Sequence, residues 1–64
     1  MDYVHIEVDR VAKITEKAML VEIDGEEVWL PLSQISPEDR DQYQEGDEDV
    51  SMCITEWIAK EKGL

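Results

Sequence analysis

The sequence predicts a mainly β fold with short helices, arranged as a small, strongly bent antiparallel barrel or half-barrel of four to five strands. Apolar and polar residues alternate in several short runs, as they do in half-buried strands. Asp24-Gly25 separates two of these runs, and this dipeptide is a strong hairpin signal. The 64 residues, 1–64, are long enough for a single domain. With one cysteine the chain cannot form an internal disulfide, so packing or a partner must stabilise it.

The first predicted strand covers residues 3–14, YVHIEVDRVAKI, in which apolar residues alternate with polar ones. If this alternation continued without a break, Arg10 would point inward before Ala12 and Ile14 resume the apolar face. We therefore expect a bulge or sharp bend near Asp9-Arg10. One long bent strand could then serve two sides of a barrel.

The second and third predicted strands form a hairpin around Asp24-Gly25. A two-residue loop fixes the register of the two strands. The predicted cross-strand pairs are Val21 with Val28, Met19 with Leu30, Leu20 with Trp29, and Glu22 with Glu27. Trp29 and Leu20 should therefore lie on the outer face, beside an unfavourable pair of like charges. Pro31 cannot donate to a strand ladder, so it should end the third strand or lie on an edge.

A short acidic helix is predicted between the third and fourth strands. Ser36 is a good N-cap, Pro37 suits the first helical position, and acids follow in the first turn. We expect this helix to extend to about residues 43–44, with only Ile35 and Tyr43 packed inward.

The last predicted strand is VSMCIT, residues 50–55, and a short C-terminal helix follows it. Thr55 can cap that helix at its start, and Gly63 can end it. The apolar residues expected to pack on the barrel are Trp57, Ile58 and Leu64. The predicted architecture is loosely of the oligonucleotide-binding or Src-homology type.

The charge of the chain is strongly negative and uneven. The formal net charge is −11, and residues 24–50 hold ten acidic residues against Arg40 alone. This charge repels a phosphate backbone, so direct nucleic-acid binding is disfavoured. The segment 36–49 is either a solvated helix and loop that keeps the protein soluble, or a surface that imitates nucleic acid and docks on a basic protein. Its acidic residues are Glu38, Asp39, Asp41, Glu45, Asp47, Glu48 and Asp49.

The residues needed for catalysis or metal binding are sparse. The chain has one histidine, His5, and one cysteine, Cys53, and no third group is specified that would orient the imidazole. The chain cannot supply four zinc ligands of this type, and it lacks EF-hand spacing and a glycine-rich phosphate loop. We therefore expect no enzymatic activity, no metal and no cofactor. The residues before Asp9 alternate instead of forming an apolar run, so we expect no secretion signal or membrane span and a cytoplasmic setting.

Trp29 has two interpretations. It could cover a minor second core under the C-terminal helix, together with Leu20 and Trp57 or Ile58, or it could face a partner as a binding hot spot. Trp29 and Tyr3 could also act as stacking platforms for single-stranded nucleic acid. The nearby acids Glu7, Glu22 and Glu27 oppose that use.

Two stretches, VWLPLSQI and EWIAKEKGL, resemble short proteins encoded by bacteriophages and prophages. In these proteins a hairpin ends in Trp-Leu-Pro-x-Ser-Gln-Ile and the chain ends in Trp-(Leu/Ile)-Ala-x-x-Lys-Gly-Leu. The resemblance covers residues 17–35 and 55–64. It implies a phage or bacterial cytoplasmic origin and favours a role in interaction with the host, but it supplies no assigned activity. The acidic residues 36–49 lie outside it.

The leading functional hypothesis is a non-enzymatic protein-binding module that occupies a basic site on a host nucleic-acid-handling or defence protein, as an anti-CRISPR inhibitor would. Negative charge would steer the encounter, while Trp29 and Leu20, with Glu22 and Glu27 beside them, would supply the contact. The alternatives are a single-stranded nucleic-acid accessory protein that stacks bases on its aromatic residues, and a structural homodimer that pairs edge strands or Trp29 faces. The aromatic residues of the first alternative are Tyr3, Trp29 and Trp57.

Overall fold

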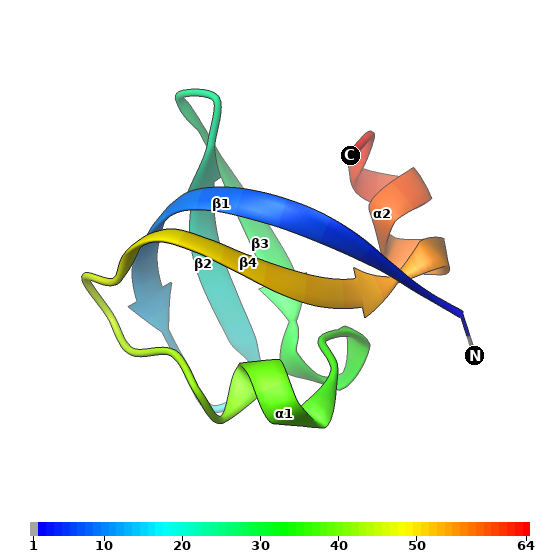
Figure 1. The fold of residues 1–64 in the computed structure, drawn as a ribbon, viewed down its shortest axis with the longest axis horizontal. Helices are drawn as coiled ribbons and strands as arrows, with labels where there is room; N and C mark the ends of the chain where they lie inside the picture. Colours follow the sequence, from blue (N-terminus) through cyan, green and yellow to red (C-terminus); the bar gives the residue numbers. More distant parts are fainter. Residues whose placement is uncertain (1) are drawn as a thin grey trace.

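A computed structural model describes residues 2–64 as a mainly β protein with four antiparallel strands in one sheet (Figure 1). The strands are β1 (Tyr3–Ile14), β2 (Ala18–Ile23), β3 (Glu26–Pro31) and β4 (Glu48–Thr55), in the spatial order β3-β2-β1-β4. The helical elements are the 3₁₀ turn η1 (Leu32–Gln34), α1 (Pro37–Arg40) and α2 (Glu56–Lys62). Within residues 2–64 no helix is long and apolar enough to cross a membrane.

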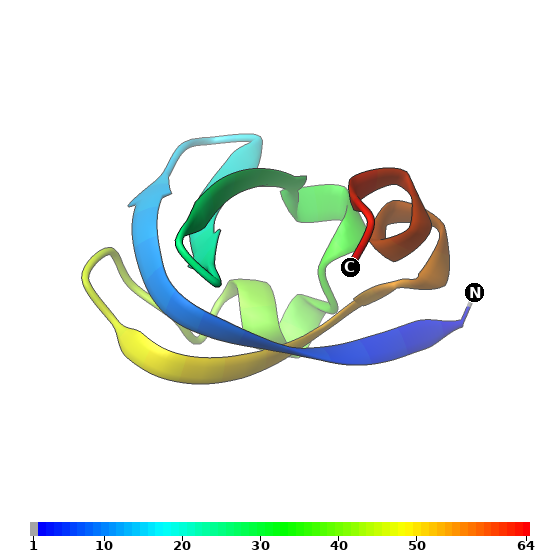
Figure 2. The ribbon, with the colours of Figure 1, turned by 90° about the horizontal axis from the view of Figure 1, so that it is seen from above.

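The long strand β1 connects the two halves of the sheet, as its length predicted. Its first part pairs with β4, from Tyr3 opposite Thr55 to Arg10 opposite Glu48. Its last part pairs with β2, from Arg10 opposite Glu22 to Ile14 opposite Met19. The strand bends strongly between these parts, so that the chain curves around its core when seen from above (Figure 2).

The bend in β1 differs in detail from the prediction. Two exposed residues, Asp9 and Arg10, separate the buried Val8 from the buried Val11. The alternation of buried and exposed residues is therefore interrupted at the expected position. The irregularity in pairing with β2 lies later, between Val11 and Lys13. The prediction that Ala12 resumes the apolar face is wrong, because Val11 takes that place. The backbone of Val11 is hydrogen-bonded to the loop before β4, which covers it.

The β2–β3 hairpin has the predicted register. Leu20 lies opposite Trp29, Val21 opposite Val28, Met19 opposite Leu30 and Glu22 opposite Glu27. The turn residues Asp24 and Gly25 both have positive φ, 51° and 81°, as a tight two-residue hairpin loop requires. The hairpin therefore buries Met19, Val21 and Leu30 and leaves Trp29 on its other face.

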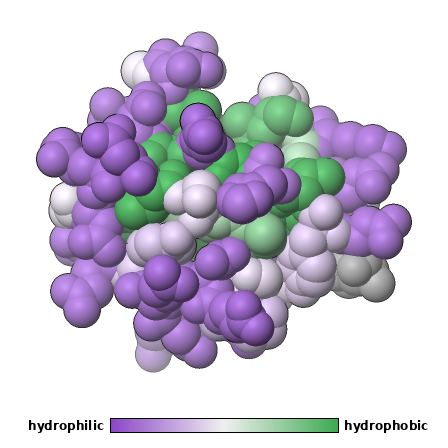
Figure 3. Space-filling model, viewed as in Figure 1, coloured by the Kyte–Doolittle hydropathy of each residue, from purple (hydrophilic) through white to green (hydrophobic). Residues whose placement is uncertain are grey.

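The core lies on the concave side of the sheet and draws on every strand and on α2. Its fully buried residues include Val8 and Val11 from β1 and Met52 and Ile54 from β4. Ile35 is buried and pairs with Ile54 through an isolated bridge, the one β-bridge outside the named strands in residues 2–64. The sheet is open, with β3 and β4 as its edges. On the face shown in Figure 3, hydrophilic residues cover most of the surface and hydrophobic ones show between them.

The acidic helix is shorter than predicted. Ser36 caps it, with Pro37 at its start and Asp39 in its first turn, but α1 ends at Arg40 instead of near residues 43–44. The chain after Arg40 forms a loop in which the backbone N–H of Gln44 donates to the carboxylate of Asp47. As expected, Ile35 is buried, and Tyr43 is half-buried. The 3₁₀ turn η1 was not predicted.

The C-terminal helix has the predicted caps but a different packing face. Thr55 caps its start, and Gly63, at φ 71°, ends it with the two hydrogen bonds of a Schellman motif. Ile58 and Ala59 are buried, whereas Trp57 is 60% exposed and Leu64 is also exposed. The expectation that Trp57 and Leu64 pack inward is wrong. Consecutive helical residues point about 100° apart, so a short helix that buries both Ile58 and Ala59 turns Trp57 outward.

Candidate functional site

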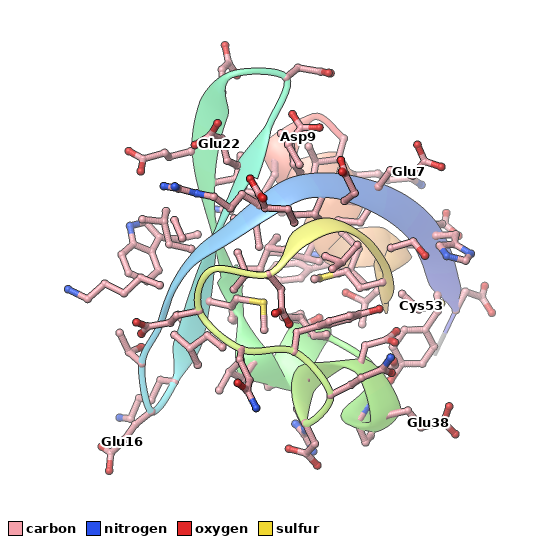
Figure 4. The ribbon with its side chains drawn as sticks, turned by 60° about the vertical axis from the view of Figure 1, so that its left-hand side comes forward. Glu7, Asp9, Glu16, Glu22, Glu38 and Cys53 are labelled. Atoms are coloured by element: carbon pink, nitrogen blue, oxygen red, sulfur yellow. The ribbon has the colours of Figure 1, made fainter. Side chains whose placement is uncertain are left out.

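The predicted partner-binding residues do not form one surface. Glu22 on β2 and Glu38 on α1 lie on opposite sides of the molecule (Figure 4). The structure brings together four of the eleven, Leu20, Glu22, Glu27 and Trp29, because their strands pair in the hairpin. We call these four residues the hairpin face.

Trp29 is the main exposed apolar group of the hairpin face. Its side chain is 44% exposed and lies directly opposite the half-buried Leu20. The interpretation in which the C-terminal helix covers Trp29 is wrong, because α2 packs against β4 and β1. It buries Ile58 and Ala59 there. The indole is therefore available to a second molecule.

Two basic residues share the outer face with these four, and sequence reasoning missed both. Arg10 lies opposite Glu22 on one side and Glu48 on the other. Lys13 lies opposite Leu20, because the irregularity after Val11 shifts the pairing by one residue. The bend was expected near Asp9-Arg10, so the sequence did not predict a change of pairing after Val11.

The charges of the outer face therefore follow the strand order. The basic residues Arg10 and Lys13 belong to β1, whereas Glu27 on the edge strand β3 has only Glu22 opposite it. Neighbouring strands lie about 4.8 Å apart, so the basic groups attach about 10 Å from β3. The free edge of the hairpin face is acidic and aromatic.

Several acids of the segment 36–49 form internal hydrogen bonds. The Asp39 carboxylate accepts from the backbone N–H of Cys53 at 2.7 Å and from the Ser36 hydroxyl at 2.8 Å. Glu45 accepts from the backbone N–H of Ile14 and Asp47 from that of Gln44, both at 2.9 Å. These three carboxylates hold the segment to the sheet and shape its loop. Four others make no hydrogen bond or ion pair within residues 2–64 and are exposed: Glu38, Asp41, Glu48 and Asp49.

Tyr43 links the same segment to β4. Its hydroxyl donates to the backbone carbonyl of Ser51. Burial raises the pKa of this phenol above its ordinary value, and the nearby negative charges of Asp39 and Asp47 raise it further. Each of these effects disfavours the phenolate, so the neutral, hydrogen-bonding form persists in alkaline solution.

His5 and Cys53 are opposite each other in the β1–β4 ladder, a meeting that the sequence did not specify. In the described part of the chain no hydrogen bond joins the two side chains, and none orients the imidazole. A histidine-activated thiol needs such an orienting group. The pair therefore lacks the geometry of a nucleophilic site.

The residues 2–64 contain no cluster of three or more His, Cys, Asp or Glu side chains that could hold a metal ion. In the same range, every buried side-chain nitrogen or oxygen has a hydrogen-bond partner. The interior thus offers no unsatisfied polar group to a ligand, and the hairpin face is the strongest candidate site. Protein-family models, curated proteins and solved structures were all compared with the chain, and none of them matches it.

Proposed function

We propose that this protein is a non-enzymatic, acidic protein-binding module that docks on a basic site of a nucleic-acid-handling protein through its hairpin face. The observation that carries the proposal is Trp29, which is 44% exposed on an edge strand, opposite Leu20. Exposed tryptophans with apolar neighbours are frequent binding hot spots. The adjacent Glu22 and Glu27 match a basic partner.

The mechanism is occupancy. The net charge of −11 attracts a basic surface over distance and raises the association rate, most strongly at low salt. Trp29 and Leu20 then lose water against the partner, which slows dissociation. Exposed acids elsewhere, among them Glu38 and Asp41, add to the field without touching the partner.

The resemblance of VWLPLSQI and EWIAKEKGL to phage and prophage proteins supports a host-directed form of this function. A phage protein that occupies the nucleic-acid site of a bacterial defence nuclease would act as an inhibitor of the anti-CRISPR kind, in the cytoplasm of the host. The fold proposed for this role is a half-barrel of the oligonucleotide-binding type. The bridge between Ile35 and Ile54 supports it, because it links the chain after β3 to β4.

The experiment is capture from nuclease-treated bacterial lysate on the immobilised protein. We expect a basic, nucleic-acid-binding protein to be retained at low salt and released at high salt. Trp29→Ala should weaken its binding by about 30-fold, the loss of about 2 kcal/mol typical of a hot spot. Trp57→Ala removes a more exposed indole from α2 and is the matched control, which should leave binding unchanged.

Charge variants complete this test. Glu22→Gln with Glu27→Gln should slow association more than Glu38→Gln with Asp41→Asn, although each double variant removes two charges. Equal effects of the two double variants would show that only net charge matters. Equal effects of Trp29→Ala and Trp57→Ala would remove the hairpin face as the site.

A second candidate, a single-stranded nucleic-acid accessory protein, is favoured by one observation. Lys13 lies opposite Leu20 and shares the outer face with Trp29, so an aromatic and a cation meet on one surface. Titration with oligothymidylate at low ionic strength tests it, because base stacking quenches indole fluorescence. Quenching that Trp29→Ala abolishes would support this candidate over the first.

A further inference from the structure

The two edges of the sheet are treated differently by the rest of the chain. Along β4, the backbone N–H of Cys53 donates to Asp39, its carbonyl accepts from the Ser36 backbone N–H at 2.9 Å, and Tyr43 donates to the carbonyl of Ser51. The segment around α1 thus covers that edge as another strand would. Along β3, no hydrogen bond to the outer backbone groups is present within residues 2–64. The β3 edge is free.

The hydrogen bonds of the hairpin identify which residues face this free edge. The Leu32 N–H donates to the Lys17 carbonyl at 2.8 Å. Counting back from Leu32, every second residue of β3 directs its backbone N–H and C=O groups toward β2. In the hairpin register these are Leu30, Val28 and Glu26. The residues between them, Trp29 and Glu27, direct their N–H and C=O groups away from β2.

The side chains of Glu27 and Trp29 are also exposed. Both project onto the outer face, where Glu22 and Leu20 lie opposite them. The inner-face neighbour Val28 is only half-buried at the open edge. A strand added here would meet acid and indole on one side of the sheet and apolar groups on the other.

We propose that the β3 edge binds an extended basic segment of the partner protein as a fifth strand, antiparallel to β3 as every pair in the sheet is. The outer-face side chains of that segment would be basic, since Glu27 has no cation opposite it, and an arginine can also stack on the Trp29 indole. The alternate side chains would be apolar and extend the face of Val28. The inference deepens the proposed function and rests on it.

The geometry limits the added strand to about five residues. The turn at Asp24-Gly25 ends the edge on one side, and Pro31, which has no N–H, ends it on the other. A second copy of this chain is disfavoured as occupant, because its β3 strand carries the acids Glu26 and Glu27 and offers no basic residue to the edge. Each copy also carries a net charge of −11.

The test uses a synthetic peptide, acetyl-Arg-Val-Arg-Val-Arg-Val-Arg-amide, and the Trp57→Phe variant, in which Trp29 is the only indole. Binding at low ionic strength should change the Trp29 fluorescence. Two isomeric peptides each carry three methyl groups on backbone nitrogens. In one peptide the three valines are methylated, and in the other three of the arginines are. Because an arginine paired with Trp29 in an antiparallel strand directs its N–H toward β3, arginine methylation should weaken binding at least tenfold and valine methylation should not.

Three other results would overturn the inference. Equal binding of both methylated peptides would mean that the face attracts basic chains without strand addition, and the proposed function would stand alone. No binding of the parent peptide, while the lysate partner is still captured in a Trp29-dependent way, would have the same meaning. Sedimentation that shows a dimer at micromolar concentration, abolished by Trp29→Ala, would make a second copy the occupant.

Discussion

The carboxylate of Asp39 accepts a hydrogen bond of 2.7 Å from the backbone N–H of Cys53, a group on the outer edge of β4. The same oxygen accepts from the Ser36 hydroxyl, which in turn caps α1. In the sequence Asp39 is one more contributor to the negative charge. In the structure its carboxylate accepts a hydrogen bond that a neighbouring strand would otherwise accept. This contact helps to close the β4 edge, whereas the β3 edge has no comparable contact within residues 2–64.

Replacement of Asp39 tests this structural role. Asp39→Ala should lower the free energy of unfolding by about 1–3 kcal/mol, because the Cys53 N–H loses its acceptor. Asp41→Ala removes the same charge from an exposed neighbour whose carboxylate makes no hydrogen bond within residues 2–64, and it should change stability by less than about 0.5 kcal/mol. Urea unfolding of both variants makes the comparison. Equal losses would assign the effect to charge and not to the hydrogen bond.

Tyr43 should make stability fall in strongly alkaline solution. Its pKa is raised in the folded protein by burial and by Asp39 and Asp47. Above the ordinary tyrosine pKa, near 10, the unfolded chain therefore loses a proton that the folded protein keeps. The contribution is fully present below pH 10 and disappears as the pH rises through the folded-state pKa.

The variant Tyr43→Phe separates this contribution from the rest of the chain. It should lower stability by about 1 kcal/mol at neutral pH, through loss of the bond to Ser51, and flatten the decline above pH 10. Absorbance titration of Tyr3→Phe, in which Tyr43 is the only tyrosine, measures the raised pKa directly. An unaltered alkaline decline in Tyr43→Phe would assign that decline to other groups.

The elements of the fold that local chemistry determines were predictable from the sequence. Asp24-Gly25 specifies a two-residue turn, and the turn then fixes every pair of the β2–β3 register. The same holds for α2, where Thr55 and Gly63 cap the helix at the predicted ends. In each case a few adjacent residues determine the geometry.

The parts that depend on contacts between distant residues were not predictable in the same way. Nothing near Asp39 in the sequence indicates that its carboxylate meets Cys53, which lies 14 residues later. The pairing shift after Val11 depends on β2, and it brings Lys13 opposite Leu20. The sequence therefore predicted which residues of β2 and β3 form the hairpin face. It did not predict that Arg10 and Lys13 of β1 lie beside them.

Thr55 is expected to be the most sensitive polar residue of the core. Its buried hydroxyl accepts from the Ile58 N–H at 3.2 Å and donates to the Gln34 side chain at 2.6 Å, which joins α2 to η1. Thr55→Val keeps the shape but loses both bonds, and it should lower stability by about 1–3 kcal/mol. Thr55→Ser keeps the hydroxyl. Hydrogen exchange at the Ile58 amide should accelerate in the valine variant alone, and equal acceleration in the serine variant would show that loss of the hydroxyl cap is not the cause.

Leu20 and Leu30 provide the sharpest separation of folding from binding, because they lie on neighbouring strands with opposite faces. Leu30 is fully buried, so Leu30→Ala should lower stability by about 2–5 kcal/mol. A 64-residue domain has a total stability of only about 3–10 kcal/mol, so this variant should melt at a much lower temperature than the unaltered protein. Circular dichroism during heating measures this loss.

Leu20→Ala should behave in the opposite way, since Leu20 is half-buried on the outer face opposite Trp29. We expect it to lower stability by less than half as much as Leu30→Ala and to weaken capture of the basic partner, because its methyl groups form the apolar contact with Trp29. A variant that keeps full binding while it loses as much stability as Leu30→Ala would show that Leu20 belongs to the core. The apolar part of the hairpin face would then consist of Trp29 alone.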